Sequence, residues 1–262
     1  MAHLNTAVTP LDKGGLAARI RAGETTIGSF AGLGSTMAIE VLAAAGLDWV
    51  LVDLEHGGGS EASVGDAVAA AGGYGAATLV RVETPDRIRI GRALDAGAAG
   101  VMLPRVDSAD EVAAIIPHLH YPPLGDRGVA TYNRSLRWGM DKDALKTSDS
   151  EVITIVQIET TGALAEVDAI AALDAVDVLF VGPLDLSYAL GVPLDFTAPV
   201  FRDALDTVVE AARKHGKSAG ILSADAAVAS TRAEQGFTFL PVGSDSTLLA
   251  DTAAAVISIL RD

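Results

Sequence analysis

Short apolar runs rich in β-branched residues recur along the chain, and alanine-rich segments with helical periodicity separate them. Runs of this kind predict buried strands. We expect eight of them, at Thr26–Ala31, Trp49–Leu54, Ala77–Val82, Ala99–Leu103, Val152–Ile158, Val178–Val181, Ser218–Leu222 and Thr238–Val242. The regular alternation of strands with helical segments predicts a parallel sheet.

Helix end signals support the same alternation. Ser35–Ala45 starts at a serine and is followed by Gly46, the expected asymmetry of helix caps. Thr84 and Pro85 predict the start of another helix, with proline at its first position, which ends at Gly97. Further helices are expected at Asp107–Ile116, Pro199–His215, Ala224–Gln235 and Asp245–Leu260, and an extra helix at Lys13–Ala22 would plug the N-terminal side of the sheet.

Eight alternating units indicate the α/β class and a closed (β/α)8 TIM barrel with an extra N-terminal helix, and residues 1–262 are expected to form one domain. An open doubly wound sheet is the alternative. It would carry a phosphate loop after its first strand, but the turn at Gly32 and Gly34 lacks a third glycine and predicts a simple tight turn. The long connection from Pro117 to Ser150 shows no clear strand, and such loops are often functional lids or interface elements.

Composition narrows the classes of partner. The formal net charge of −15 disfavours binding to nucleic acid or to an anionic membrane surface. The chain has no cysteine, which excludes disulfides and cysteine-based metal sites and is compatible with a cytoplasmic protein. Met1–Pro10 lacks the pattern of a signal peptide, and no apolar run is long enough to predict a membrane span.

Charged and polar groups follow four of the apolar runs. They are Asp53, His56, Arg81, Glu159 and Asp185. A charged group at the end of a buried strand is costly to desolvate unless it is paired or bound to a metal. Since barrel enzymes build their sites at the C-terminal ends of the strands, this placement predicts a catalytic mouth.

A histidine and an arginine stand out among these groups. His56 is either a loop histidine or a catalytic base, and Asp53 is close enough in sequence to orient its ring while Gly57–Gly59 lets other groups approach. Arg81 is either paired with Glu83 at the rim or supplies a fixed positive charge to an oxygen that becomes anionic.

Two acids on successive strands suggest a metal site. Glu159 and Asp185 would supply oxygen ligands to Mg²⁺, Mn²⁺ or a similar divalent cation, although Asp185 could instead cap a short helix. Gln157 shares a strand face with Glu159, and the backbone N–H groups of Gly182–Asp185 could hold a substrate carboxylate.

The positions of the lysines argue against Schiff-base chemistry. None of the five lies at the C-terminal end of a predicted strand, and Lys217 precedes the seventh strand at the opposite face. A carbanion formed here would therefore be stabilised by a metal and an arginine.

With these residues in place, the chain resembles the metal-dependent pyruvate aldolases of the HpcH/HpaI family, such as 4-hydroxy-2-oxoheptanedioate aldolase and 2-dehydro-3-deoxyglucarate aldolase. The resemblance covers nearly the whole chain. The motifs that carry it are Val52–His56, Leu79–Arg81, Ala93–Pro104, Gly125–Val129, Gln157–Thr160 and Val181–Ser187.

The resemblance implies the following roles. Glu159 and Asp185 match the ligands of a divalent cation (Mg²⁺, Mn²⁺ or Co²⁺), and His56 matches the catalytic base. Arg81 matches the arginine that stabilises the enolate, and Asp53 the acid beside the histidine.

Further roles are implied for residues around these. Asp95 matches an acid that raises the basicity of the histidine, within its own subunit or across a subunit boundary. Gln157 and the backbone at Leu184 match substrate contacts, as do Gly182 and Asp185 beside it. The resemblance also implies a hexamer that often exchanges its C-terminal helix, and a function in the catabolism of aromatic compounds or sugar acids.

The implied reaction is the cleavage or formation of 4-hydroxy-2-oxo acids, which gives pyruvate, or a related 2-oxo acid such as hydroxypyruvate, plus an aldehyde. The chain departs from the family pattern at Gly57–Gly59, at Leu184 and in residues 129–140, all of which touch the substrate-facing rim. The residues that select the acceptor aldehyde are expected in Gly57–Ser60, in Val129–Trp138 and near Leu222. The alternatives are a CoA-thioester lyase of the same superfamily and a non-catalytic binding protein.

Overall fold

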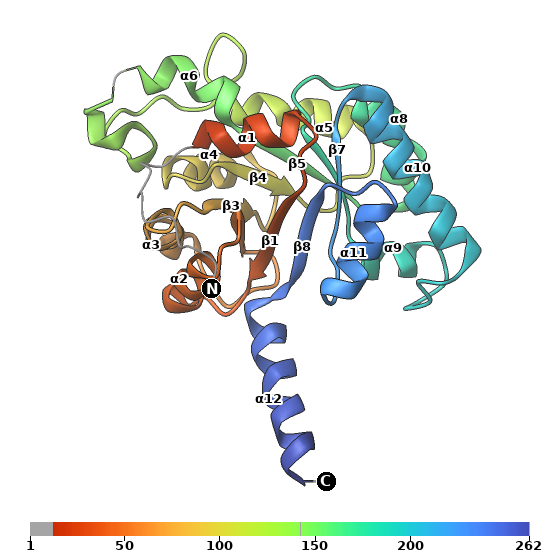
Figure 1. Ribbon diagram of the computed structural model, residues 1–262. Coiled ribbons are helices and arrows are strands. Elements are labelled where there is room, and N and C mark those ends of the chain that lie inside the picture. Colours follow the sequence, from red (N-terminus) through yellow and green to blue (C-terminus); the bar gives the residue numbers. More distant parts are fainter. Residues whose placement is uncertain (1–12, 142, 262) are drawn as a thin grey trace.

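A computed structural model describes residues 13–141 and 143–261. Eight parallel strands pair in sequence order and close into a barrel, which confirms the predicted fold class (Figure 1). They are β1 (Thr26–Ala31), β2 (Trp49–Asp53), β3 (Ala77–Arg81), β4 (Gly100–Leu103), β5 (Ile153–Ile158), β6 (Val178–Val181), β7 (Ser218–Ile221) and β8 (Phe239–Ser244).

Helices surround this barrel. The α-helices are α1 (Lys13–Arg21), α2 (Thr36–Ala44), α3 (Val64–Gly72), α4 (Arg87–Asp95), α5 (Ala109–Ile115), α6 (Ala144–Glu151), α7 (Thr161–Ala165), α8 (Val167–Ala171), α9 (Pro183–Ala189), α10 (Pro199–His215), α11 (Ala226–Glu234) and α12 (Asp245–Arg261). Short 3₁₀ turns lie at η1 (Glu61–Ser63), η2 (Ile116–Leu119) and η3 (Arg134–Gly139).

One predicted helix start was wrong. Helix α4 does not begin with Pro85 at its first position, because Asp86 caps it two residues later than expected. The Asp86 carboxylate accepts hydrogen bonds from the backbone N–H groups of Ile88 and Arg89, both at 3.0 Å. The Asp86 side chain thus satisfies two backbone N–H groups in the first turn of α4, which otherwise have no partner within the helix.

The barrel interior is filled by alternate residues of the strands. Trp49 and Leu51 of β2 point inward, and the Trp49 ring stacks on Phe239 of β8 with centroids 4.1 Å apart. Leu16 and Ile20 of α1 pack onto the same cluster. Helix α1 therefore closes the N-terminal end of the barrel, as predicted, and leaves the C-terminal end for a site.

The long connection between β4 and β5 holds η2, η3 and α6 and, within the described residues 117–141 and 143–150, no strand. Its Arg127 is buried, donates a hydrogen bond to Asp95 at 2.7 Å and lies over the Tyr121 ring. The expectation of no signal peptide concerns Met1–Pro10, which lie outside the described residues. Of the helices in the described part of the chain, none combines the length and apolarity needed to cross a bilayer.

Gly28 provides the space that Trp49 occupies, because a Cβ at Gly28 would overlap the indole ring. We expect Gly28→Ala to lower the free energy of unfolding by about 1–3 kcal/mol through overpacking. A methyl group added at Gly91 on α4 would meet no described atom within 4 Å, and the φ of Gly91 is not positive, so Gly91→Ala should raise stability by about 0.5–1 kcal/mol. Urea unfolding of both variants measures the contrast, and equal effects would contradict this account of the barrel core.

Candidate active site

The inward face of β2 and β3 becomes polar at its last position. Trp49, Leu51 and Asp53 alternate along β2, and Asp53 is in register with Arg81 at the end of β3. Because side chains on one face of a strand repeat every second residue, the acid and the guanidinium share the top layer of the barrel.

Arg81 is held rigidly in this layer. Its Nε and Nη2 donate to the two oxygens of Asp53 at 2.9 and 2.7 Å, Nη1 lies 3.1 Å from Glu55, and the guanidinium lies 5.2 Å from the centre of the Phe30 ring. Burial alone would raise the pKa of Asp53, but the hydrogen bonds and charge of Arg81 lower it below the ordinary value. The predicted alternative, a pair between Arg81 and Glu83, is not what the structure contains.

Asp53 does not orient the His56 ring, so this part of the prediction was wrong. Its Oδ1 accepts from the backbone N–H groups of Glu55 and His56 at 3.0 and 3.3 Å, and both of its oxygens hold Arg81. The described partners of this carboxylate are thus backbone N–H groups and the bidentate guanidinium, not the imidazole ring. The carboxylate nearest the ring is Glu55, whose Oε2 lies 4.0 Å from His56 Nε2, and the imidazole itself is 69% exposed.

The glycine turn after His56 does allow close approach. A Cβ at Gly57 would overlap the Asp53 carbonyl and come within 3.2 Å of Gly32. Gly32 belongs to the turn after β1, where the N–H groups of Gly32 and Leu33 donate to Asp245 at 2.9 and 3.1 Å. These donors bind a buried carboxylate of the chain itself, which fits the predicted tight turn and not a phosphate loop.

Glu159 lies at the end of β5 with both oxygens bound by neutral donors. Oε1 accepts from the Arg105 backbone N–H at 2.8 Å, and Oε2 accepts from Gln157 Nε2 at 2.7 Å. Burial raises the pKa of Glu159, and the negative charges of Asp185 and Glu55 raise it further. A buried carboxylate with an unfavourable negative environment is one that a cation would stabilise.

Gly182 leaves room for this carboxylate. A Cβ at Gly182 would lie 2.6 Å from Glu159 Oε2 and 3.4 Å from Gln157 Nε2. Gly182 is also the N-cap of α9, whose first turn contains Asp185. In the described structure the Asp185 side chain caps no backbone N–H group. Its Oδ1 instead lies 3.7 Å from Arg105 Nη1, and half of the side chain is exposed.

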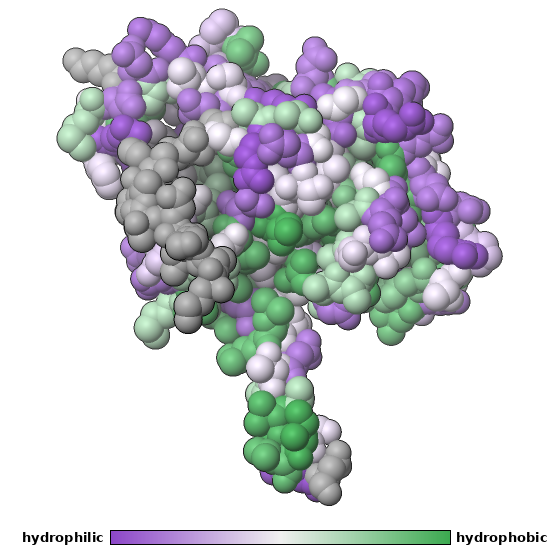
Figure 2. Space-filling model, viewed as in Figure 1, coloured by the Kyte–Doolittle hydropathy of each residue, from purple (hydrophilic) through white to green (hydrophobic). Residues whose placement is uncertain are grey.

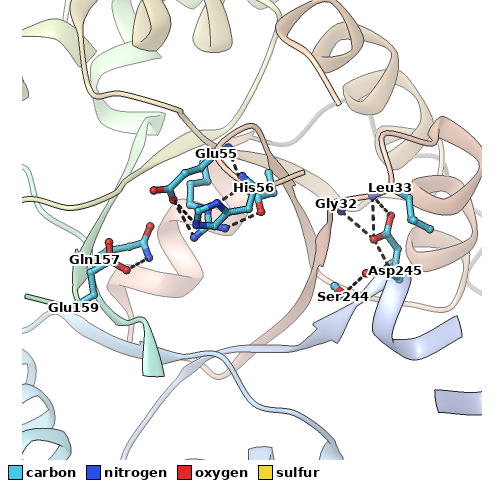
Figure 3. A network of polar contacts seen from close by, with 11 residues as sticks. Gly32, Leu33, Glu55, His56, Gln157, Glu159, Ser244 and Asp245 are labelled. Atoms are coloured by element: carbon cyan, nitrogen blue, oxygen red, sulfur yellow. Dashed lines mark hydrogen bonds and ion pairs between the residues drawn. The ribbon is translucent and has the colours of Figure 1, made fainter. Parts of the chain in front are cut away.

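Asp53, Arg81 and Asp185 line one pocket of about 450 Å³ at the C-terminal end of the barrel. In Figure 3, Glu55 and His56 lie between Gln157 and Glu159 on one side and Asp245, Gly32 and Leu33 on the other. The side toward β1, β7, β8 and α12 carries hydroxyl and leucine side chains and one acid. They are Leu33, Leu222, Ser223, Ser244, Ser246, Thr247 and Asp251.

Most predicted site residues meet here. The pocket is lined by Asp53, His56, Arg81, Gln157, Gly182, Leu184 and Asp185, and Glu159 bonds to Gln157 behind Gly182. Asp95 is not brought to the mouth within the chain: it ends α4 and binds the buried Arg127. Sequence reasoning missed the contacts of Glu55 and Arg105. Their signals were the spacing of Glu55 two residues after Asp53 and the position of Arg105 two residues after β4.

The donor set fits a hard divalent cation. Glu159 and Asp185 offer carboxylate oxygens, the ligands that Mg²⁺ and Mn²⁺ prefer, and few protein ligands leave positions for water and substrate. Within residues 13–141 and 143–261 no cluster of three or more His, Cys, Asp or Glu side chains forms a fuller metal cage. Gln157 Oε1 is buried and has no hydrogen-bond partner in the described structure, so the site holds an acceptor that the chain leaves unsatisfied.

Comparison with known proteins finds one family. The profile described as HpcH/HpaI aldolase/citrate lyase matches residues 26–252. The chain is 37% identical to the hydroxypyruvate/pyruvate aldolase of Pseudomonas aeruginosa, over 88% of this chain and 87% of that one. It is also 37% identical to the 4-hydroxy-2-oxovalerate aldolase of Rhodococcus jostii (strain RHA1), over 89% and 91%.

A solved structure agrees with these sequence matches. A crystal structure of a HpcH/HpaI aldolase/citrate lyase family protein from Burkholderia cenocepacia J2315 superposes with a TM-score of 0.91 at 34% identity. It covers 95% of this chain and 100% of that one. The residues that the family profile matches, 26–252, include every strand of the barrel.

The Asp53–Arg81 pair predicts a pH-dependent stability. Asp53→Asn should lower the free energy of unfolding near neutral pH by on the order of 3 kcal/mol, because Arg81 stays buried with its charge. The pKa of Asp53 is lowered by folding, so this stabilisation is present above the ordinary carboxyl pKa and is lost as the pH falls through the folded value. Urea unfolding of both proteins should show the difference shrinking below about pH 4, and a constant difference would contradict the assignment.

Proposed function

The chain belongs to the HpcH/HpaI aldolase/citrate lyase family, and from this membership we propose that it is a carbon–carbon lyase that cleaves or forms 4-hydroxy-2-oxo acids. The products of cleavage would be pyruvate, or a related 2-oxo acid such as hydroxypyruvate, and an aldehyde. The observation that carries the proposal is a guanidinium fixed by Asp53 in the same pocket as Gln157 and Asp185, with Glu159 hydrogen-bonded to Gln157 behind it.

We propose Glu159 and Asp185 as the residues that hold a divalent cation. When bound, Mg²⁺, Mn²⁺ or Co²⁺ would supply Lewis-acid polarisation to the 2-oxo acid. Gln157 Nε2 and the Arg105 N–H orient Glu159 by one hydrogen bond to each oxygen, and the space at Gly182 keeps that carboxylate unobstructed. The N–H groups at the first turn of α9, Leu184 and Asp185, have no acceptor within the helix and would bind the substrate carboxylate.

Arg81 would stabilise the charge that develops on the keto oxygen. Asp53 accepts from two of the five N–H donors of Arg81, and Glu55 lies 3.1 Å from Nη1, which still leaves donors for an oxygen in the pocket. Because Asp53 and Phe30 already fix the guanidinium, little reorganisation is needed when the enolate forms. Burial alone would lower the pKa of Arg81, but the hydrogen bonds and charge of Asp53 raise it above its ordinary value, so the guanidinium stays charged.

His56 would move the proton of the reaction. In cleavage, a ring nitrogen takes the proton of the 4-hydroxyl, the C3–C4 bond breaks, and its electrons form the enolate of the 2-oxo acid as the aldehyde leaves. In condensation, C3 of the enolate attacks the aldehyde carbon, and the protonated ring returns the proton to the new hydroxyl. The exposed position of His56 at the rim suits a group that meets the aldehyde half of the substrate.

The aldehyde would lie toward β7 and β8, where leucine and hydroxyl side chains line the wall. The names of the relatives give different substrates, so an assay has to identify which aldehyde this enzyme releases. The thioester alternative of the superfamily is tested in the same assay by offering a citramalyl-type CoA thioester, whose cleavage also releases pyruvate.

We also propose that the chain forms a homo-oligomer, with a hexamer as the expected size. Helix α12 extends away from the barrel (Figure 1), and Figure 2 shows apolar side chains gathered along its outer part. The exposed apolar residues there include Val256, Ile257, Ile259 and Leu260. A bare apolar helix needs a partner surface. Because Arg127 binds Asp95 within the chain, a catalytic contribution of Asp95 would require a second chain.

Pyruvate release from a series of 4-hydroxy-2-oxo acids with different tails tests the proposed activity. A chelator should abolish release, and Mg²⁺, Mn²⁺ or Co²⁺ should restore it. Glu159→Gln should raise the Mn²⁺ concentration for half-maximal activity by roughly tenfold or more, since outer-shell changes alone cost that much. The exposed Glu210→Gln on α10 serves as a matched control. Release that is insensitive to chelator and to Glu159→Gln would refute the cation site.

The assembly has its own test in light scattering after size exclusion. The wild-type chain should elute as a multiple of its 26.7 kDa mass. Val256→Asp with Leu260→Asp places two charges on one face of α12 and should give smaller species, because charged residues in an apolar interface stay unpaired. Leu124→Asp, at an equally exposed leucine outside α12, should leave the mass unchanged. A wild-type monomer would refute the proposal.

A further inference from the structure

Arg105 contacts both acids of the proposed cation site, through two different parts of the residue. Its backbone N–H donates to Glu159 Oε1 at 2.8 Å, and its guanidinium Nη1 lies 3.7 Å from Asp185 Oδ1. Arg105 follows β4, Glu159 follows β5, and Asp185 lies in α9 after β6, and these three strands are consecutive in the barrel. Arg105 is thus the guanidinium nearest to Asp185 among the described ion pairs.

The backbone of Arg105 is unusual in a way that fixes these contacts. Its φ is 53°, in the left-handed region that a residue with a Cβ rarely adopts. Such strain persists only where the surroundings require it, and here it accompanies the hydrogen bond to Glu159. The side chain is different, because 65% of it is exposed and Asp185 is its described ionic partner. The backbone is therefore anchored, while the charged end is free to exchange with solvent.

A guanidinium beside Asp185 occupies the electrostatic position that a cation would take. The acid can be neutralised by Arg105 or by a divalent ion, and the two positive charges repel each other at close range. We infer that Arg105 competes with the divalent cation for Asp185 and so weakens the affinity of the site for metal, while its backbone N–H positions Glu159. This inference rests on the proposed function, because it presumes that Glu159 and Asp185 bind the cation.

The consequence is a weaker site, whose metal occupancy depends on the concentration of free cation. An exposed ion pair contributes little by itself, so the competition should change affinity moderately and not abolish it. The effect should also weaken at high salt, because the groups are solvent-exposed and screened. A purely structural role for the side chain would show neither the sign nor the salt dependence.

Calorimetric titration with Mn²⁺ alone, without substrate, tests this directly. Arg105→Gln keeps the backbone N–H and the left-handed position but removes the charge, and it should tighten Mn²⁺ binding roughly 2- to 10-fold at low salt. Arg105→Lys, which keeps the charge, should bind Mn²⁺ much as the wild type does. Arg89→Gln is the matched control, because Arg89 forms an exposed ion pair with Glu61 at 3.1 Å and neither residue lines the pocket.

Each outcome decides a separate point. Tighter binding by Arg105→Gln that fades as ionic strength rises supports the inference. Unchanged or weaker binding by Arg105→Gln, with Mn²⁺ binding in the wild type lost in Glu159→Gln, refutes the inference and leaves the cation site standing. If the wild type binds no Mn²⁺, both the cation site and the competition are refuted.

Discussion

The ion pair between Asp53 and Arg81 is the constraint on which the site depends. It arises from strand register, since the last inward positions of β2 and β3 lie opposite each other. An arginine cannot escape burial by losing its proton, so it needs the acid in order to stay in the top layer of the barrel. In return the acid fixes the guanidinium with two hydrogen bonds, and the charge points into the pocket without further rearrangement. Preorganised charge of this kind stabilises a developing anion far better than a mobile side chain can.

A second feature is the surplus of negative charge on the other side of the pocket. Arg81 is already paired with Asp53 and close to Glu55, so it leaves Glu159 and Asp185 poorly neutralised. The chain compensates for this partly with neutral donors to Glu159 and partly with the loosely held Arg105. One side of the pocket therefore carries the permanent positive charge of Arg81. On the other side, Glu159 and Asp185 suit a cation that binds from solution.

Much of this organisation could be predicted from the sequence, and the failures have identifiable causes. The strand limits came out almost unchanged, because apolar runs bounded by turn residues locate strands well. The sequence also placed Asp53, Arg81, Gln157 and Glu159 at strand ends, where a barrel must bring them together. The sequence did not predict that Asp53 binds Arg81. His56 was expected as its partner because it is close in sequence, whereas Arg81 lies on the neighbouring strand.

Other features lay beyond pattern reasoning. The pairing of Asp95 with Arg127 joins the end of α4 to a residue 32 positions later in an irregular connection, where no periodicity applies. The left-handed backbone of Arg105 could not be predicted from the sequence, because arginine rarely adopts this conformation. Sequence pattern gives faces and ends of elements; it does not give the partner that each polar group finds across them.

The plug formed by α1 has a kinetic consequence. Because Leu16 and Ile20 belong to the core that fills the barrel, the pocket at the C-terminal end does not continue to the N-terminal end. If the proposed roles of Arg81 and Gln157 hold, a small keto acid bound to them would be covered by the second substrate to enter. Substrate binding should then be ordered. In synthesis the keto acid would bind first, and in cleavage it would leave last. An excess of aldehyde that binds first would prevent the keto acid from reaching its site.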